Sequence, residues 1–147
     1  AEARGLITGM TLDSGAAHIV RAALEAIAYQ TADLVTAMMA QGAEPLRELR
    51  IDGGMASNDW FCQFLADVLD IAVLRPPHLE TTALGAAMLA GHQCGAWPSL
   101  FSDAAAGAAA RFAPRMAASE RRRLRTGWHE AICRTLPMHG GASHQSR

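Results

Sequence analysis

A glycine-rich stretch in the middle of the chain is the strongest candidate for a ligand site. Residues 50–58 read Arg-Ile-Asp-Gly-Gly-Met-Ala-Ser-Asn, with an apolar stretch before them and an apolar helical pattern after them. Gly53 and Gly54 carry no Cβ, so a flat ligand can lie against their backbone. The start of the following helix offers free N–H groups and the positive end of its dipole. The amide of Asn58 adds a donor and an acceptor for a base or a sugar, although an ordinary tight turn also explains an Asp-Gly pair.

The other chemistry-bearing side chains do not form a recognisable constellation. His18, at the start of a helical pattern, is a ligand or a base in one interpretation and helps to cap the helix in the other. Glu25 is a functional carboxylate, or it makes a structural hydrogen bond or faces solvent. His92 and Cys94 have the spacing of two metal ligands, but no second pair completes a four-ligand site. We therefore predict no catalytic residue and no metal site within this chain.

The basic residues exclude several classes of protein. All thirteen are arginine, and without lysine there is no Walker A phosphate loop, no protein-kinase lysine and no Schiff-base lysine. The spacing of the glycines is not G-x-G-x-x-G, so a Rossmann dinucleotide site is not supported. The run Arg121-Arg122-Arg123-Leu124-Arg125 is predicted to form the solvated face of an amphipathic helix. With a net charge of −1, nucleic acid is not an expected partner.

Hydrophobic periodicity predicts alternating strands and helices around these candidates. The order indicates an α/β fold built from βαβ units. Ser57 or Asn58 is expected to cap the second helix, and Thr81 or Thr82 the third. A loop or weak helix is predicted over 102–114 and a disordered tail over 137–147. The expected strands are 5–10, 46–52 and 71–74, and the expected helices begin near 17, 59, 83 and 119.

The cellular location of the protein is predicted from features that the sequence lacks. The three cysteines do not form a C-x-x-C pair, and Cys62 is expected to be a small core residue. The longest apolar run, 83–91, is too short to span a bilayer, and no signal peptide precedes the first motif. We expect a cytoplasmic protein. The chain opens without Met, which is expected of a piece of a longer protein.

Several blocks of the sequence together resemble the FGGY carbohydrate kinases. Residues 5–10 followed by 18–25 are similar to the second signature of that family, and 27–31 to the glycerol kinase version of the next turn. The resemblance covers roughly residues 4–136 and is closest to the glycerol kinases within the family. The further matching blocks are 50–54 with Asn58, 75–76, Glu80, 82–87, 127–128, Ala131 and Arg134.

The resemblance implies a partial actin-like ATPase (ribonuclease H-like) domain with a βαβαβα core and a further C-terminal helix. Residues 1–136 would belong to the second lobe of such a kinase, on the adenine side of the nucleotide cleft. Gly54 and Asn58 match the residues that contact adenine in the family, and Gly53 is their neighbour in the same turn. The implied ligands are ATP or ADP, with Mg²⁺, and glycerol in the full-length enzyme, which would be a homo-oligomer.

The same resemblance implies what this chain does not contribute. The phosphate-binding turns, the catalytic Asp, the Mg²⁺ ligands and the glycerol contacts belong to earlier parts of the family's enzymes, so the chain alone is expected to be inactive. Two alternatives stay open. One is another FGGY sugar or polyol kinase such as a xylulose kinase, and the other is a non-catalytic binding or assembly module.

Overall fold

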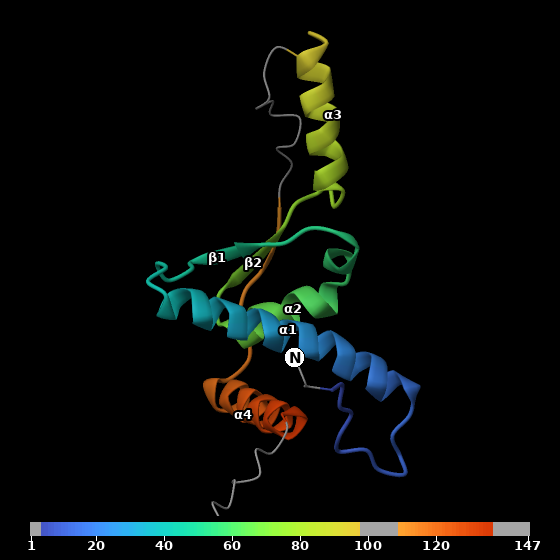
Figure 1. The fold of residues 1–147 in the computed structure, drawn as a ribbon, viewed down its shortest axis with the longest axis vertical. Helices are drawn as coiled ribbons and strands as arrows, with labels where there is room; N and C mark the ends of the chain where they lie inside the picture. The colour runs from blue at the N-terminus through green and yellow to red at the C-terminus, as the bar shows by residue number, and fades with distance from the viewer. Residues whose placement is uncertain (1–3, 98–108, 137–147) are drawn as a thin grey trace, which may run out of the picture.

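The computed structural model describes residues 4–97 and 109–136, in which helices and short strands alternate (Figure 1). The mixed α/β class predicted from the sequence is confirmed. The elements are α1 Ala16–Ala40, β1 Glu48–Arg50, the 3₁₀ helix η1 Gly54–Ser57, α2 Asp59–Leu69, β2 Ala72–Arg75, α3 Thr81–Gln93, β3 Ala110–Phe112 and α4 Ala118–Thr135.

The three strands form one sheet in the order β1-β2-β3. β1 and β2 are parallel, with Leu49 beside Val73, and α2 connects them, so this part is the βαβ unit predicted from the sequence. β3 runs antiparallel to β2, with Arg111 beside Leu74. The prediction of a loop or weak helix is wrong for residues 110–112. A three-residue edge strand is too short to show the alternation that identifies a strand, and it is held by its pairing with β2.

The predicted first strand does not form. Residues 5–10 are exposed and without regular structure, so the order begins with α1 and the predicted βαβαβα order is wrong at its first element. A strand needs a neighbour for its backbone N–H and C=O groups. None of the strands among the described residues pairs with this segment. The apolar pattern alone therefore did not determine its conformation.

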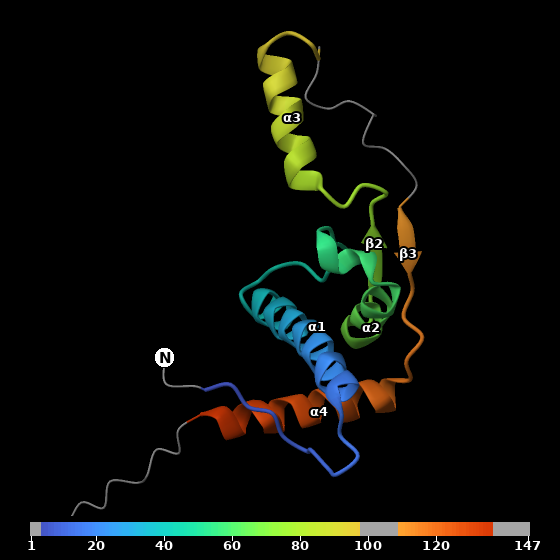
Figure 2. The ribbon, with the colours of Figure 1, turned by 90° about the vertical axis from the view of Figure 1, so that its right-hand side faces the viewer.

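The core lies where α1, α2 and β2 pack together, with α4 across one side (Figure 2). Tyr29 of α1 meets the Phe64 ring edge-on at 5.7 Å and stacks on Trp128 of α4 at 5.4 Å, measured between ring centroids. Such aromatic pairs add stability beyond the area that they bury. Cys62 is fully buried, as predicted from its place on an apolar helical face.

Helix α3 extends away from this core (Figures 1 and 2). It contains no buried residue, although it is rich in alanine and leucine. The helix begins at Thr81 after Glu80, and neither threonine caps it, so that prediction is wrong. The hydroxyl of Thr81 instead donates to a carboxylate oxygen of Asp52, which ties the start of α3 to the segment that follows β1. Within the part of the chain that the structure describes, no helix is long and apolar enough to cross a membrane.

Candidate functional site

The glycine-rich turn lies at the carboxyl ends of the parallel strands β1 and β2 (Figure 1). The backbone N–H of Ile51 donates to the Leu74 carbonyl at 3.0 Å and continues the pairing beyond β1. The N–H of Gly53 then donates to the Leu79 carbonyl, also at 3.0 Å. The chain turns there into η1 and α2. In open α/β sheets ligands bind at this edge, and a ligand site at these residues is the prediction from the sequence.

The two glycines differ in backbone conformation. Gly53 has φ +82° and ψ 176°, a conformation that is essentially restricted to glycine. Gly54 opens η1 and does not have a positive φ. A Cβ built on either residue would have no atom of residues 4–97 or 109–136 within 4 Å beyond its chain neighbours, so the space in front of both is open in the described structure. The turn can therefore receive the flat face of a ligand against its backbone.

Asn58 is the N-cap of α2, which confirms that prediction. Its Oδ1 accepts a hydrogen bond from the backbone N–H of Phe61 at 3.1 Å. The side chain is exposed, and its amide nitrogen has no acceptor among residues 4–97 and 109–136. Ser57 does not share the capping role, because its hydroxyl donates to the Gly54 carbonyl at 2.6 Å. Asn58 is therefore oriented by the helix and offers two N–H donors to solvent.

Arg75, at the end of β2, is hydrogen-bonded to the turn. Its Nη1 donates to the carbonyl oxygen of Ala56 at 2.9 Å and to Oδ1 of Asp59 at 2.6 Å. The thiol of Cys62 also donates to the Ala56 carbonyl, at 3.2 Å. The hydrogen bond to Asp59 raises the pKa of the Arg75 guanidinium above its usual range, and burial raises the pKa of the Cys62 thiol. No local sequence signal marks Arg75 as part of the site, because only the folding of the chain brings its side chain to the turn.

A hollow of about 340 Å³ lies beside the turn. Its walls come from the last residue of η1, from the end of β2 with the loop that follows, and from the start of β3. The lining residues are Ser57, Arg75, Pro76, Pro77, Leu79 and Ala110.

The remaining candidates have structural partners. The Nδ1 of His18 accepts from the backbone N–H of Gly15 at 3.1 Å, so His18 does help to cap α1. Glu25 accepts from Arg21 Nε at 2.7 Å and from the Tyr29 hydroxyl at 3.2 Å, in agreement with its predicted structural role. Both side chains belong to the framework of α1 rather than to the turn.

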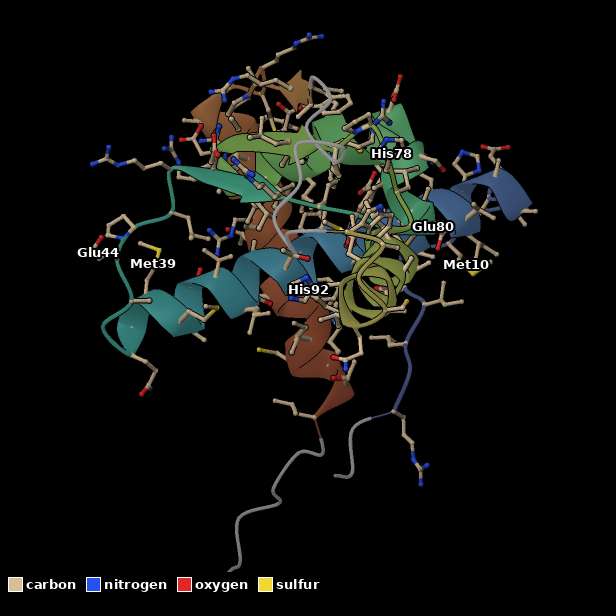
Figure 3. All side chains as sticks on the ribbon, turned by 90° about the horizontal axis from the view of Figure 1, so that it is seen from above. Met10, Met39, Glu44, His78, Glu80 and His92 are labelled. Carbon is tan, nitrogen blue, oxygen red and sulfur yellow. The ribbon has the colours of Figure 1, made fainter. Side chains whose placement is uncertain are left out.

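The histidines that the structure describes do not converge. His78 and Glu80 lie in the loop that leads to α3, and His92 lies apart from them (Figure 3). His92 Nδ1 is 3.2 Å from the Trp97 carbonyl oxygen, and the Cys94 thiol donates to the Ala90 carbonyl. Over residues 4–97 and 109–136, no group of three or more His, Cys, Asp or Glu residues has the geometry to hold a metal ion.

The arginine run on α4 is only partly a solvated face, which corrects the prediction. Arg121 donates to the Asp67 carbonyl and to the Asp70 carboxylate, both at 2.6 Å, and so ties α4 to the C-terminal end of α2. Arg125 donates to the Thr36 hydroxyl of α1 at 3.2 Å. These contacts could not be read from helical periodicity, because their partners lie in other elements.

Comparison with known proteins identifies the family of the chain. Residues 1–94 match the C-terminal domain of the FGGY family of carbohydrate kinases. A glycerol kinase of Gluconobacter oxydans is 53% identical over 146 residues, which cover 99% of the chain and 28% of that relative. A glycerol kinase of Rhodospirillum centenum is 51% identical over 140 residues, 92% of the chain and 27% of the relative. The chain thus spans little more than a quarter of the length of these relatives.

Solved structures agree with the sequence matches. A crystal structure of Plasmodium falciparum glycerol kinase with ADP matches with a TM-score of 0.75 and 38% identity. The match covers 92% of this chain and 28% of the Plasmodium chain. A xylulose kinase from Rhodospirillum rubrum matches 86% of the chain and 26% of its own with a TM-score of 0.60 and 22% identity, which shows the fold alone. These kinases have the actin-like ATPase fold, which confirms the fold family expected from the sequence. The chain belongs to the FGGY family of carbohydrate kinases, with residues 1–94 matching the C-terminal domain of that family.

Proposed function

We propose that this chain forms the adenine-nucleotide side of a glycerol kinase, which transfers the γ-phosphoryl group of Mg²⁺-bound ATP to glycerol and gives sn-glycerol 3-phosphate and ADP. The observation that carries the proposal is the turn at the carboxyl ends of β1 and β2. There an open glycine backbone is followed, four residues after Gly54, by the exposed amide of Asn58, which its N-cap hydrogen bond orients. Residues 1–136 would then be part of the second lobe of the enzyme, on one wall of its cleft.

In the proposed complex, the adenine ring lies against Gly53 and Gly54. No atom of the described residues lies within 4 Å of a Cβ position on either glycine, so the described part of the chain leaves room for a flat ring there. The Nδ2 hydrogens of Asn58 can donate to ring nitrogens of adenine or to a hydroxyl of the ribose, because Oδ1 is already engaged by Phe61. The fixed cap limits the rotation of the amide, which reduces the entropy lost when the nucleotide binds.

The residues that bind the phosphates and Mg²⁺ and carry out the transfer would lie in other parts of the enzyme. Phosphoryl transfer depends on positioning and on electrostatic stabilisation of the phosphates, which Mg²⁺ supplies together with other residues of the enzyme. The chain positions the nucleotide from its base end. We therefore expect the chain alone to bind nucleotide without turning it over. A homo-oligomeric enzyme in the cytoplasm remains part of the same proposal.

Glycerol is preferred as the substrate because of the pattern of identity. The glycerol kinases named above are 51–53% identical to the chain, and the glycerol kinase structure is 38% identical. The xylulose kinase structure is 22% identical. A panel of polyols and sugars, assayed with the complete gene product that carries this chain, tests the choice. Preferential phosphorylation of another polyol or of a sugar would overturn it.

The nucleotide site is tested by isothermal titration of ADP into the chain and into its Gly54→Val and Asn58→Ala variants. The branched side chain of valine projects into the proposed ring position, and alanine removes the amide donors. Both variants are expected to weaken ADP binding at least about tenfold, the loss expected for a sterically blocked or unpaired contact. Unchanged affinity in both variants would overturn the site assignment.

A further inference from the structure

Arg75 joins two neighbouring segments of the turn, η1 and α2, which the Cys62 thiol and the backbone N–H of Asn58 also connect through weaker, uncharged donors. The Ala56 carbonyl lies within η1, and Asp59 is the first residue of α2, so both flank Asn58. A single guanidinium nitrogen donates to both. A charged donor makes stronger hydrogen bonds than a neutral one, and arginine stays charged throughout the ordinary pH range.

The guanidinium group of Arg75 is itself held in place by its surroundings. Its side chain is one-fifth exposed, and the guanidinium lies 5.3 Å from the centre of the Phe112 ring, where a cation is favoured. Ala56, which accepts from it, is almost fully buried. The carbonyl of Ala56 therefore has no access to bulk water as a substitute partner, although the Cys62 thiol supplies a weaker second donor.

We propose that Arg75 is a positioning residue for the nucleotide: by fixing the Ala56 carbonyl and the start of α2, it sets the distance and direction of the Asn58 amide relative to the Gly53–Gly54 backbone. This inference rests on the proposed adenine site and deepens it. Arg75 does not touch the ligand in this account. Its effect passes through the turn, since an imprecisely held binding side chain loses affinity even when it is present.

The chain contains a matched arginine that allows a structural role to be separated from a positioning role. Arg121 also donates to a backbone carbonyl of the α2 region, that of Asp67, and to an aspartate, Asp70. Its side chain is comparably shielded, with 14% exposed against 21% for Arg75. It acts at the C-terminal end of α2, whereas Arg75 acts at the N-terminal end beside Asn58. Loss of either arginine should destabilise the fold, but only loss of Arg75 should disturb the nucleotide site.

The test compares Arg75→Met, Arg75→Lys and Arg121→Met with the parent chain. Methionine keeps the aliphatic packing on Phe112 and removes the charge and the donors. Lysine keeps a cation that can reach one of the two acceptors. The affinity for ADP is measured by isothermal titration, and thermal unfolding of each variant is followed separately. The same substitutions are made in a chimera in which residues 1–147 replace the matching segment of the Gluconobacter oxydans glycerol kinase, so that the KM values for ATP and glycerol are measured.

Arg75→Met is expected to raise the dissociation constant for ADP and the KM for ATP about tenfold, with the KM for glycerol unchanged. Arg75→Lys should recover part of that loss, and Arg121→Met should change nucleotide affinity less than about twofold. Equal weakening by Arg75→Met and Arg121→Met, or no weakening by Arg75→Met, would overturn the inference. If Arg75→Met does not fold, Arg75→Lys decides by the same comparison. The proposed function fails separately, when Gly54→Val and Asn58→Ala leave nucleotide binding unchanged.

Discussion

The Oδ1 of Asn58 accepts a hydrogen bond from the backbone N–H of Phe61 at 3.1 Å, so one side chain both caps α2 and presents an amide at the proposed nucleotide turn. The oxygen serves the helix, and the nitrogen faces outward. Stability and the proposed nucleotide binding at this position therefore depend on different atoms of the same amide. Substitutions can separate them.

Replacing Asn58 with aspartate should preserve the fold and impair nucleotide binding. Aspartate is as good an N-cap as asparagine, so the free energy of unfolding should change by less than about 0.5 kcal/mol. The two N–H donors are lost, and a negative charge faces the base, so the affinity for ADP should fall at least about tenfold. Urea denaturation and titration of ADP measure the two effects. Asn58→Ala is the reference, because it should lose about 1 kcal/mol of stability as well as the affinity.

The two adjacent glycines should respond differently to alanine. Gly53→Ala should cost about 1–3 kcal/mol, because its φ of +82° with an extended ψ is a conformation that alanine rarely adopts. Gly54→Ala should be nearly neutral for folding, since it has ordinary backbone angles and open space at its Cβ. Urea denaturation of both variants checks this. An equal loss of stability at the two positions would show that the turn has a different backbone.

Asp33 should make the packing of α1 on α4 sensitive to acid. Partial burial raises the pKa of this carboxyl, but hydrogen bonds from Trp128 at 2.7 Å and His129 at 3.0 Å lower it by more, so the pKa lies below its ordinary value of 3.8. Because the folded-state pKa is depressed, the stabilisation is present above about pH 4 and is lost as the pH falls through the folded-state value.

Asp33→Asn should therefore lower the unfolding free energy by about 1 kcal/mol near pH 6 and by less near pH 3. Thermal unfolding across this range measures the difference. Asp13→Asn, which changes an exposed carboxylate in the loop before α1, is the control. A cost of Asp33→Asn that is the same at both pH values would contradict this account.

The chain by itself should associate in solution. Large apolar side chains are exposed on the segment before α1, on α1 and on α3; among them are Ile7 at 63%, Leu12 at 106%, Val20 at 61% and Leu89 at 61%. Apolar patches of this kind favour contact with another surface. Light scattering at increasing concentration should show growth beyond the monomer mass. A monomer that persists at high concentration would be inconsistent with this expectation.

The site turn could be predicted from the sequence because its signals are local. Two glycines after an apolar stretch and an asparagine before an apolar helix determine a turn and a cap within nine residues. The contacts of Arg75 could not be predicted in this way. Ala56 and Asp59 lie 19 and 16 residues before it, and only the pairing of β1 with β2 brings them together.

The errors in the fold have the same cause. Residues 5–10 have the composition of a strand but no neighbouring strand among the described residues, whereas residues 110–112 have little strand signal and gain a partner in β2. Strand formation depends on pairing between distant segments, which hydrophobic periodicity does not report. Helices α1, α2 and α4 were predicted well because their hydrogen bonds and their apolar faces are encoded within a single segment.

The most direct test of the central claim is the ATP-dependent phosphorylation of glycerol by the chimera that carries residues 1–147 in the Gluconobacter oxydans enzyme. We predict an active kinase in which Asn58→Asp raises the KM for ATP at least about tenfold and leaves the KM for glycerol unchanged. If the chimera is active and neither Asn58→Asp nor Gly54→Val changes its KM for ATP, the assignment of this turn as the adenine site is contradicted.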